Sequence, residues 1–188
     1  MIVVGIDPSL TGTGLAVLTA REGRVDTALR TIGSTGKRSD TWAMRAARLT
    51  KLRNELMRHV PRGATLAVLE GPSYGSPTPG QHDNAWFRGK VYDALTSLGI
   101  PIAVCPPKTR AKWATDNGNS GKADVAVAVS RLWPVVEWRG DDEADALALA
   151  SIGAQHIGMP VPYLILERHK LALAKIEWPT INGYSQSK

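Results

Sequence analysis

Four acidic side chains occupy positions from which a folded chain could gather them into one site. Asp7 and Glu70 each end an apolar run, and Asp142 and Asp145 lie one helical turn apart at the start of a third apolar segment. If the first two runs are neighbouring strands and the third is a helix packed across their ends, the four carboxylates converge. Such a cluster is unfavourable by itself, because like charges held close together repel and raise each other's pKa.

A divalent cation would remove this repulsion, since hard ions such as Mg²⁺ take oxygen ligands of the kind that carboxylates supply. The helix dipole stabilises acidic residues in a first turn by about 0.3–1 kcal/mol each, which accounts for Asp141 and Glu143 as capping residues. It does not account for Asp142 and Asp145, which share the face of the apolar stripe. The four acids therefore predict a metal-dependent phosphotransfer nuclease.

The elements that must position these acids follow from the apolar pattern. Apolar runs separated by short turns predict three strands in an antiparallel meander, followed by two strands parallel to the first. The predicted strands are 2–7, 15–19, 25–32, 66–70 and 101–105. The predicted helices are about 40–59 (capped by Asp40), 81–97, 109–115, 122–133 and 141–157. This order gives an α/β fold, a five-stranded mixed sheet with helices on both faces.

The 188 residues fit one domain with a sizeable core. We expect this domain to span residues 1–158 and residues 159–188 to form a C-terminal extension. Within the extension, 164–176 has the pattern of a basic amphipathic helix, and the polar stretch 182–188 is expected to be disordered.

Composition indicates the partner and the compartment. A net charge of +6 around an acidic site suggests a polyanionic substrate. The single cysteine, Cys105, excludes an internal disulfide and suits a reducing cytoplasm. The four histidines show no zinc-ligand spacing, so we expect them at the surface or at helix ends. The first apolar run has no basic leader and stops at Asp7, so we expect neither a signal peptide nor a membrane span.

Taken in order, the motifs resemble those of RuvC-type Holliday junction resolvases. They are Gly5-Ile6-Asp7-Pro8, a strand ending in Glu70, the Gly-rich loop Asn117–Gly121 followed by Lys122, and Asp142-x-x-Asp145-Ala-Leu-Ala. The resemblance covers about residues 1–157. It implies a ribonuclease H-like fold, a homodimer, and nicking of four-way DNA junctions that depends on Mg²⁺ or Mn²⁺.

By motif match, the resemblance makes Asp7, Glu70, Asp142 and Asp145 the catalytic carboxylates. We expect them to hold two ions about 3.5–4 Å apart, with Asp7 bridging both, so that the ions clamp the scissile phosphate. Lys122 corresponds to the loop lysine that contacts this phosphate and would offset charge in the transition state. A C2 dimer would place two such sites on the symmetric strands of a junction.

Basic and aromatic residues interleave between Trp86 and Lys122, as suits backbone contacts and base stacking. The residues expected to contact DNA are Arg88, Lys90, Lys108, Lys112, Lys122 and Tyr74. Lys112 falls near a second basic position of the family, and Lys108 competes with it for that role. Trp86 and Tyr92 are better explained as residues of the core or of a dimer interface.

Three departures from the family pattern bear on substrate choice. Ser9 stands where the family usually has Gly, and Gly71-Pro72-Ser73 follows Glu70 where the family has Gln and, nearby, an aromatic that stacks on junction bases. Tyr74 comes one position late for that aromatic. The extension beyond Gly158 exceeds the bacterial pattern, as in a phage or otherwise divergent member.

Other functions compete with junction resolution. Within the nuclease class, the alternative is a broader branched-DNA or flap nuclease. The turn Gly12-Thr13-Gly14 also resembles the one with which sugar kinases and related ATPases hold ATP phosphates, although such proteins need two comparable lobes. A DNA-binding protein without activity is the third possibility, against which four intact acids argue. The sequence identifies no helicase partner.

Overall fold

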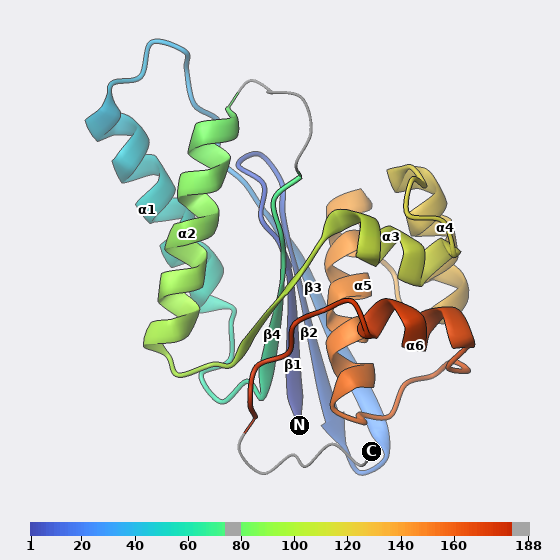
Figure 1. Ribbon diagram of the computed structural model, residues 1–188. Coiled ribbons are helices and arrows are strands. Elements are labelled where there is room, and N and C mark those ends of the chain that lie inside the picture. Colours follow the sequence, from blue (N-terminus) through green and yellow to red (C-terminus); the bar gives the residue numbers. More distant parts are fainter. Residues whose placement is uncertain (74–79, 182–188) are drawn as a thin grey trace.

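The computed structural model describes residues 1–73 and 80–181, so Tyr74 and the stretch 182–188 lie outside the described residues. Five strands form one mixed sheet in the order β3-β2-β1-β4-β5 (Figure 1). They are β1 (Ile2–Asp7), β2 (Thr13–Arg21), β3 (Arg24–Ile32), β4 (Leu66–Glu70) and β5 (Ile102–Cys105). The first three strands pair antiparallel, and β4 and β5 run parallel to β1, which confirms the predicted sheet.

Helices cover both faces of the sheet (Figure 1). On one face lie α1 (Trp42–Arg58) and α2 (Gln81–Ser97), and on the other lie α3 (Pro107–Thr115), α4 (Lys122–Leu132), α5 (Asp141–His156) and α6 (Glu167–Leu173). The central strands are apolar on both sides: in β1, Val3 packs in the core cluster of α5, and Val4 packs in the cluster of α1 and α2. Within the described ranges, no helix is long and apolar enough to cross a membrane.

The parallel pairing of β1 with β4 determines where the first two acids lie. The register pairs Ile6 with Leu69, so Asp7 and Glu70, the next residue of each strand, end neighbouring strands at one edge of the sheet. Glu70 in turn pairs with Cys105 at the end of β5, and α3 begins directly afterwards. The carboxyl ends of three parallel strands therefore meet beside the first turn of α3.

Helix α5 crosses the sheet at a distance that only glycine permits. A Cβ added to Gly5 would lie 2.1 Å from the carbonyl oxygen of Ala146, and one added to Gly14 would lie 1.9 Å from that of Asp142. Both separations are far shorter than any real contact of a Cβ atom. The two glycines thus let the first turns of α5, which carry Asp142 and Asp145, pack against β1 and β2.

Two helix starts differ from the prediction. Thr41, not Asp40, caps α1, because its side chain accepts the backbone N–H of Met44. Asp40 instead accepts the backbone N–H of Lys37, as short acidic side chains in turns often do. The start of α3 is two residues earlier than predicted, at Pro107, since the fixed φ of proline suits a first helical turn.

Part of the C-terminal extension packs into the same core as the domain. Met159, Ala172 and Ile176 are buried in the cluster that contains α5, and α6 packs against α3. The helix predicted over 164–176 is shorter than expected, because only the seven residues of α6 are helical.

His169 lies in the first turn of α6, which agrees with the helix-end position expected for the histidines, but it is fully buried and not at the surface. Its ring stacks on Trp113 with the centroids 4.9 Å apart, and its Nδ1 accepts the backbone N–H of Leu166 at 3.2 Å. Burial, helped by the charge of Arg168, lowers the pKa of His169 to about 4.

Replacing Gly5 by alanine tests whether glycine sets the approach of α5. The added methyl group would meet backbone atoms of Ala146 and Ala150, so we expect the free energy of unfolding to fall by about 3 kcal/mol or more. Gly89 is the matched control, because it lies within α2 and has open space at its Cβ position. Gly89→Ala should leave stability unchanged or raise it by about 0.5–1 kcal/mol. Denaturant unfolding measures both variants, and equal effects would contradict the close contact.

The lowered pKa of His169 predicts a loss of stability in acid. Because an unfolded histidine titrates near 6.5, the stability that neutral His169 contributes is present above about pH 6.5 and is lost as pH falls toward 4. His169→Gln removes the titration and keeps an acceptor for Leu166. Between about pH 7 and about pH 4, wild type should lose on the order of 2–3 kcal/mol more unfolding free energy than the variant. Chemical denaturation measures the unfolding free energy of both proteins as a function of pH. If the two curves run parallel, the pKa of His169 is not lowered.

Candidate active site

The four predicted carboxylates come from three elements that meet at one edge of the sheet. Asp7 ends β1, Glu70 ends β4, and Asp142 and Asp145 lie in the first turns of α5. The side chain of Asp145 is 1% exposed, that of Glu70 12% and that of Asp142 29%, and Asp7 is 7% exposed as a residue. Three of the four are thus largely withdrawn from water, where an ionised carboxylate needs a partner.

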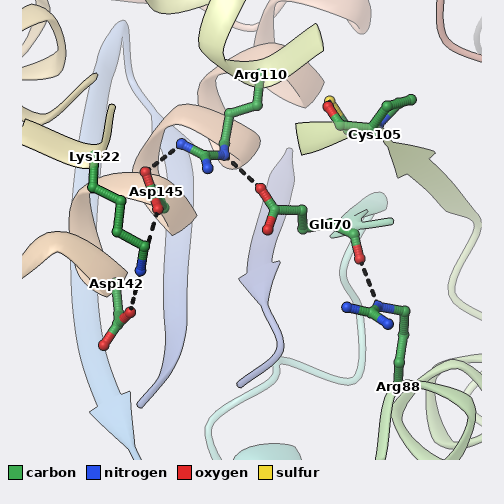
Figure 2. A network of polar contacts seen from close by, with 8 residues as sticks. Glu70, Arg88, Cys105, Arg110, Lys122, Asp142 and Asp145 are labelled. Carbon is green, nitrogen blue, oxygen red and sulfur yellow. Dashed lines mark hydrogen bonds and ion pairs between the residues drawn. The ribbon is translucent and has the colours of Figure 1, made fainter. Parts of the chain in front are cut away.

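Arg110 supplies that partner from the first turn of α3. Its Nε donates to Oε1 of Glu70 at 2.6 Å, and its Nη1 donates to Oδ1 of Asp145 (Figure 2). The guanidinium therefore bridges the end of β4 and the start of α5. Burial disfavours its charge, but the negative charges of Glu70 and Asp145 outweigh burial and raise the pKa of Arg110 further.

Lys122 reaches the same cluster from the solvent side. It is the first residue of α4, and its Nζ lies 3.1 Å from Oδ1 of Asp142 and 3.9 Å from Oδ2 of Asp145 (Figure 2). Burial disfavours the ammonium, but the hydrogen bond and charge of Asp142 outweigh it and raise the pKa of Lys122. Because its side chain is 55% exposed, this cation can meet a substrate that arrives from solvent.

The acids perturb one another, as the sequence predicts. Burial raises the pKa of Asp7 well above its usual value, and the charge of Glu70 and a hydrogen bond with it add to the effect. Burial likewise raises the pKa of Asp145 to about 6, although the charges of Arg110 and Lys122 act against this. Burial thus disfavours the ionised form of both acids, even with Arg110 and Lys122 beside the cluster.

The donor set suits a divalent ion in kind, because carboxylates are hard oxygen ligands. Oδ2 of Asp145 is buried without a hydrogen-bond partner and could serve a bound cation. The arrangement is not yet a coordination site, since Arg110 holds one oxygen each of Glu70 and Asp145. In the part of the chain that the structure describes, no three acidic, histidine or cysteine side chains are grouped for metal binding.

The other basic residues predicted to contact DNA differ in their relation to this cluster. Arg88, on α2, lies beside it, because its Nε donates to the backbone oxygen of Glu70 at 3.0 Å (Figure 2). Lys108 is exposed and Lys112 is half-buried, and among the described residues neither forms an ion pair with the four carboxylates. Lys90 reaches toward α1, where its Nζ donates to a threonine hydroxyl at 3.2 Å.

From α3, sequence reasoning selected Lys108 and Lys112 as site residues and missed Arg110. Helical spacing could have found it, because Trp113 and Ala114 lie three and four residues further on and are apolar. Arg110 therefore shares the inward face of α3, whereas Lys108 and Lys112 share the opposite face. In the structure Trp113 and Ala114 are indeed buried.

The turn Gly12-Thr13-Gly14, which suggested an ATP-binding protein, faces α5. A Cβ added to Gly12 would lie 2.2 Å from Oδ2 of Asp142, and Thr13 is fully buried. These glycines make room for the helix that carries two of the acids, not for the phosphates of a nucleotide. The turn is therefore consistent with the predicted nuclease and does not support an ATP-binding, kinase-like protein.

A sheet of this order, with carboxylates at the ends of β1 and β4 and on the helix packed across them, defines a ribonuclease H-like nuclease. Comparison with known proteins narrows the class. The chain is 32% identical over 162 residues to the crossover junction endodeoxyribonuclease RuvC of Zymomonas mobilis, an alignment that covers 83% of this chain and 92% of the relative. It is 30% identical over 169 residues to RuvC of Chelativorans sp., covering 88% and 95%. This chain belongs to the RuvC family of crossover junction endodeoxyribonucleases.

Solved structures share the fold. The RuvC structure from Thermus thermophilus matches with a TM-score of 0.65 at 22% identity, over 87% of this chain and all of that one. RuvC of T. thermophilus in complex with Holliday junction substrate matches with a TM-score of 0.62 at 20% identity, over 80% of this chain and 90% of that one. These matches confirm the predicted fold class, while no protein-family model matches the chain.

Proposed function

We propose that this chain resolves four-way DNA junctions by metal-dependent hydrolysis of phosphodiester bonds. The observation that carries the proposal is that Arg110 and the exposed ammonium of Lys122 link Glu70, Asp145 and Asp142, while Asp7 lies close enough to Glu70 for that charge to raise its pKa. Its relatives are named crossover junction endodeoxyribonucleases, and T. thermophilus RuvC has been solved with a Holliday junction substrate. We infer that such a nuclease works in the cytoplasm, which suits the buried free thiol of Cys105.

The four carboxylates would hold Mg²⁺ or Mn²⁺, two ions to a site, with Asp7 shared and Glu70, Asp142 and Asp145 completing the ligands. Bound ions of this kind activate a water molecule and stabilise the leaving oxygen of a phosphodiester. Lys122 would offset the charge that the phosphate gains in the transition state. Its Nζ is suited to this role because it lies at the solvent edge of the carboxylates.

The basic residues around the site would contact the phosphates of the DNA arms. Arg88 contacts the backbone of Glu70, while Lys108 and Lys112 lie on the outward face of α3 and would contact DNA from there. We infer that Lys90, directed toward α1, makes a more distant contact. Tyr74, the aromatic that the resemblance suggests for base stacking, would stack on a junction base.

A broader branched-DNA nuclease is the second candidate, favoured by the departure from the family pattern at Gly71-Pro72-Ser73. Incubation of the protein and Mg²⁺ with labelled four-way, three-way, flap and linear DNA decides between them. Preferential nicking of the four-way junction supports the first proposal, and equal nicking of flaps supports the second.

We infer a homodimer that places two active sites on the symmetric strands of a junction. Trp86 and Tyr92 on α2 are 37% and 43% exposed, so a core role does not explain them. Their exposure is compatible with a dimer interface, which was the other explanation preferred for these two aromatics over base stacking.

Asp7→Asn tests the assignment of the metal site. The amide cannot supply the negative charge that draws the ions, so cleavage of a four-way junction should fall by about 100-fold or more. DNA binding in a gel shift should persist or strengthen, since one charge that repels phosphate is gone. The control is Asp141→Asn, because Asp141 is exposed at the first position of α5 and should change cleavage only slightly. Full activity of Asp7→Asn in Mg²⁺ would disprove the assignment.

Lys122→Ala tests the role of the ammonium in the transition state. Because its charge matters most when the phosphate gains negative charge, turnover at saturating DNA should fall by about 10-fold or more, with a smaller change in affinity. Lys108→Ala is the comparison: its side chain is exposed and makes no ion pair with the carboxylates, so affinity should fall and turnover should not. If Lys122→Ala lowers only affinity, Lys122 is a positioning contact.

A further inference from the structure

Arg110 is the more enclosed of the two cations at the carboxylate cluster. Its side chain is 8% exposed, compared with 55% for that of Lys122. Its two ion pairs join β4 to α5 through α3, three elements that are distant along the chain. Removing one partner from a buried ion pair leaves an uncompensated charge, which is strongly destabilising. Arg110 therefore supports the cluster in the absence of any metal.

Arg110 holds one oxygen of each of two carboxylates that are proposed as metal ligands. Oε1 of Glu70 and Oδ1 of Asp145 accept from the guanidinium, and Oδ2 of Asp145 is left buried without a hydrogen-bond partner. When ionised, the four carboxylates carry four negative charges, and Arg110 and Lys122 offset two of them. A divalent ion that neutralised the remaining charge would therefore meet two carboxylates that the guanidinium already holds.

We infer that Arg110 is the counter-cation of Glu70 and Asp145 in the metal-free protein, and that its hydrogen bonds to them must break when a divalent ion binds. We call this pair of hydrogen bonds the clasp. The inference rests on the proposed function, in which both acids are metal ligands. Arginine suits such a clasp, because its planar guanidinium donates to two carboxylates at once and does not deprotonate to make way. The released guanidinium also matches a DNA phosphate in shape and charge.

Because Arg110 and the metal ion compete for the same carboxylates, the inference predicts the direction in which metal affinity changes when Arg110 is removed. A clasp that must open lowers the metal affinity of the wild type, because only the open fraction binds. Removing Arg110 should therefore strengthen metal binding. If Arg110 instead fixed Glu70 and Asp145 in the geometry that the metal requires, its removal would weaken binding.

Calorimetric titration with Mn²⁺ in the absence of DNA measures this effect. Arg110→Gln should bind Mn²⁺ about tenfold more tightly than wild type or better, because one positive charge leaves the site. Its melting temperature in chelator should be lower than that of wild type, and its rise on adding Mn²⁺ should be larger. Arg58→Gln is the control, since it removes the same charge from the far end of α1, where Arg58 pairs with Glu55. Equal or weaker Mn²⁺ binding by Arg110→Gln overturns the inference.

A second measurement uses the wild type, in case Arg110→Gln does not fold. The NMR signal of the Arg110 Nε–H, identified by its loss in Arg110→Lys, should be protected from exchange with water in the metal-free protein. Protection should disappear when the site is saturated with diamagnetic Mg²⁺. A signal that keeps its shift and protection at saturation shows that the clasp stays closed and overturns the inference.

Junction cleavage by the wild type is scored separately, so that the two proposals can fail independently. If the wild type cleaves four-way junctions and Arg110→Gln binds Mn²⁺ more weakly, only the role of Arg110 is wrong. If the wild type does not cleave junctions and Arg110→Gln binds Mn²⁺ more tightly, the clasp stands and the proposed function is wrong.

Discussion

The close approach of α5 to the sheet is the constraint on which the rest of this structure depends. Because Gly5 and Gly14 have no side chains, the helix backbone comes into direct contact with β1 and β2, and the acids of its first turns reach the strand ends. The opposite face has no such requirement, and α1 and α2 pack there through large side chains such as Leu49 and Phe87. One face of the sheet thus stabilises the fold by apolar burial, while the other also positions the charged site.

Gathering carboxylates creates an electrostatic strain that this fold offsets with two cations of different kinds. Arg110 is buried and bridges two acids with a planar, permanently charged group. Lys122 lies at the solvent edge, where a compact ammonium on a flexible stem can follow a substrate. The inner cation holds the protein's own charges together, and the outer one is exposed to solvent.

The segment after α5 supports the position of Arg110 by packing against α3, the helix that carries it. Helix α6 packs on α3, and His169 of α6 stacks on Trp113, which lies one turn after Arg110. Tyr163 meets the same Trp113 ring edge-on, with the centroids 6.1 Å apart. Residues that read as an extension in the sequence therefore hold the helix that carries the inner cation.

The sequence by itself determined the sheet, the order of its elements and the four acids, because strand ends and helix starts are local features that apolar periodicity and turn residues reveal. It also indicated Lys122, which lies directly after a glycine-rich loop. Helical spacing placed Arg110 on the apolar face of α3, but only the tertiary structure decided that this face packs against β4 and α5 and so brings Arg110 to Glu70 and Asp145. Burial of His169 was likewise beyond the sequence, because its partner Trp113 lies in a different helix. Contacts between distant segments have no local pattern, and they decided which charges in this protein are buried and which are exposed to solvent.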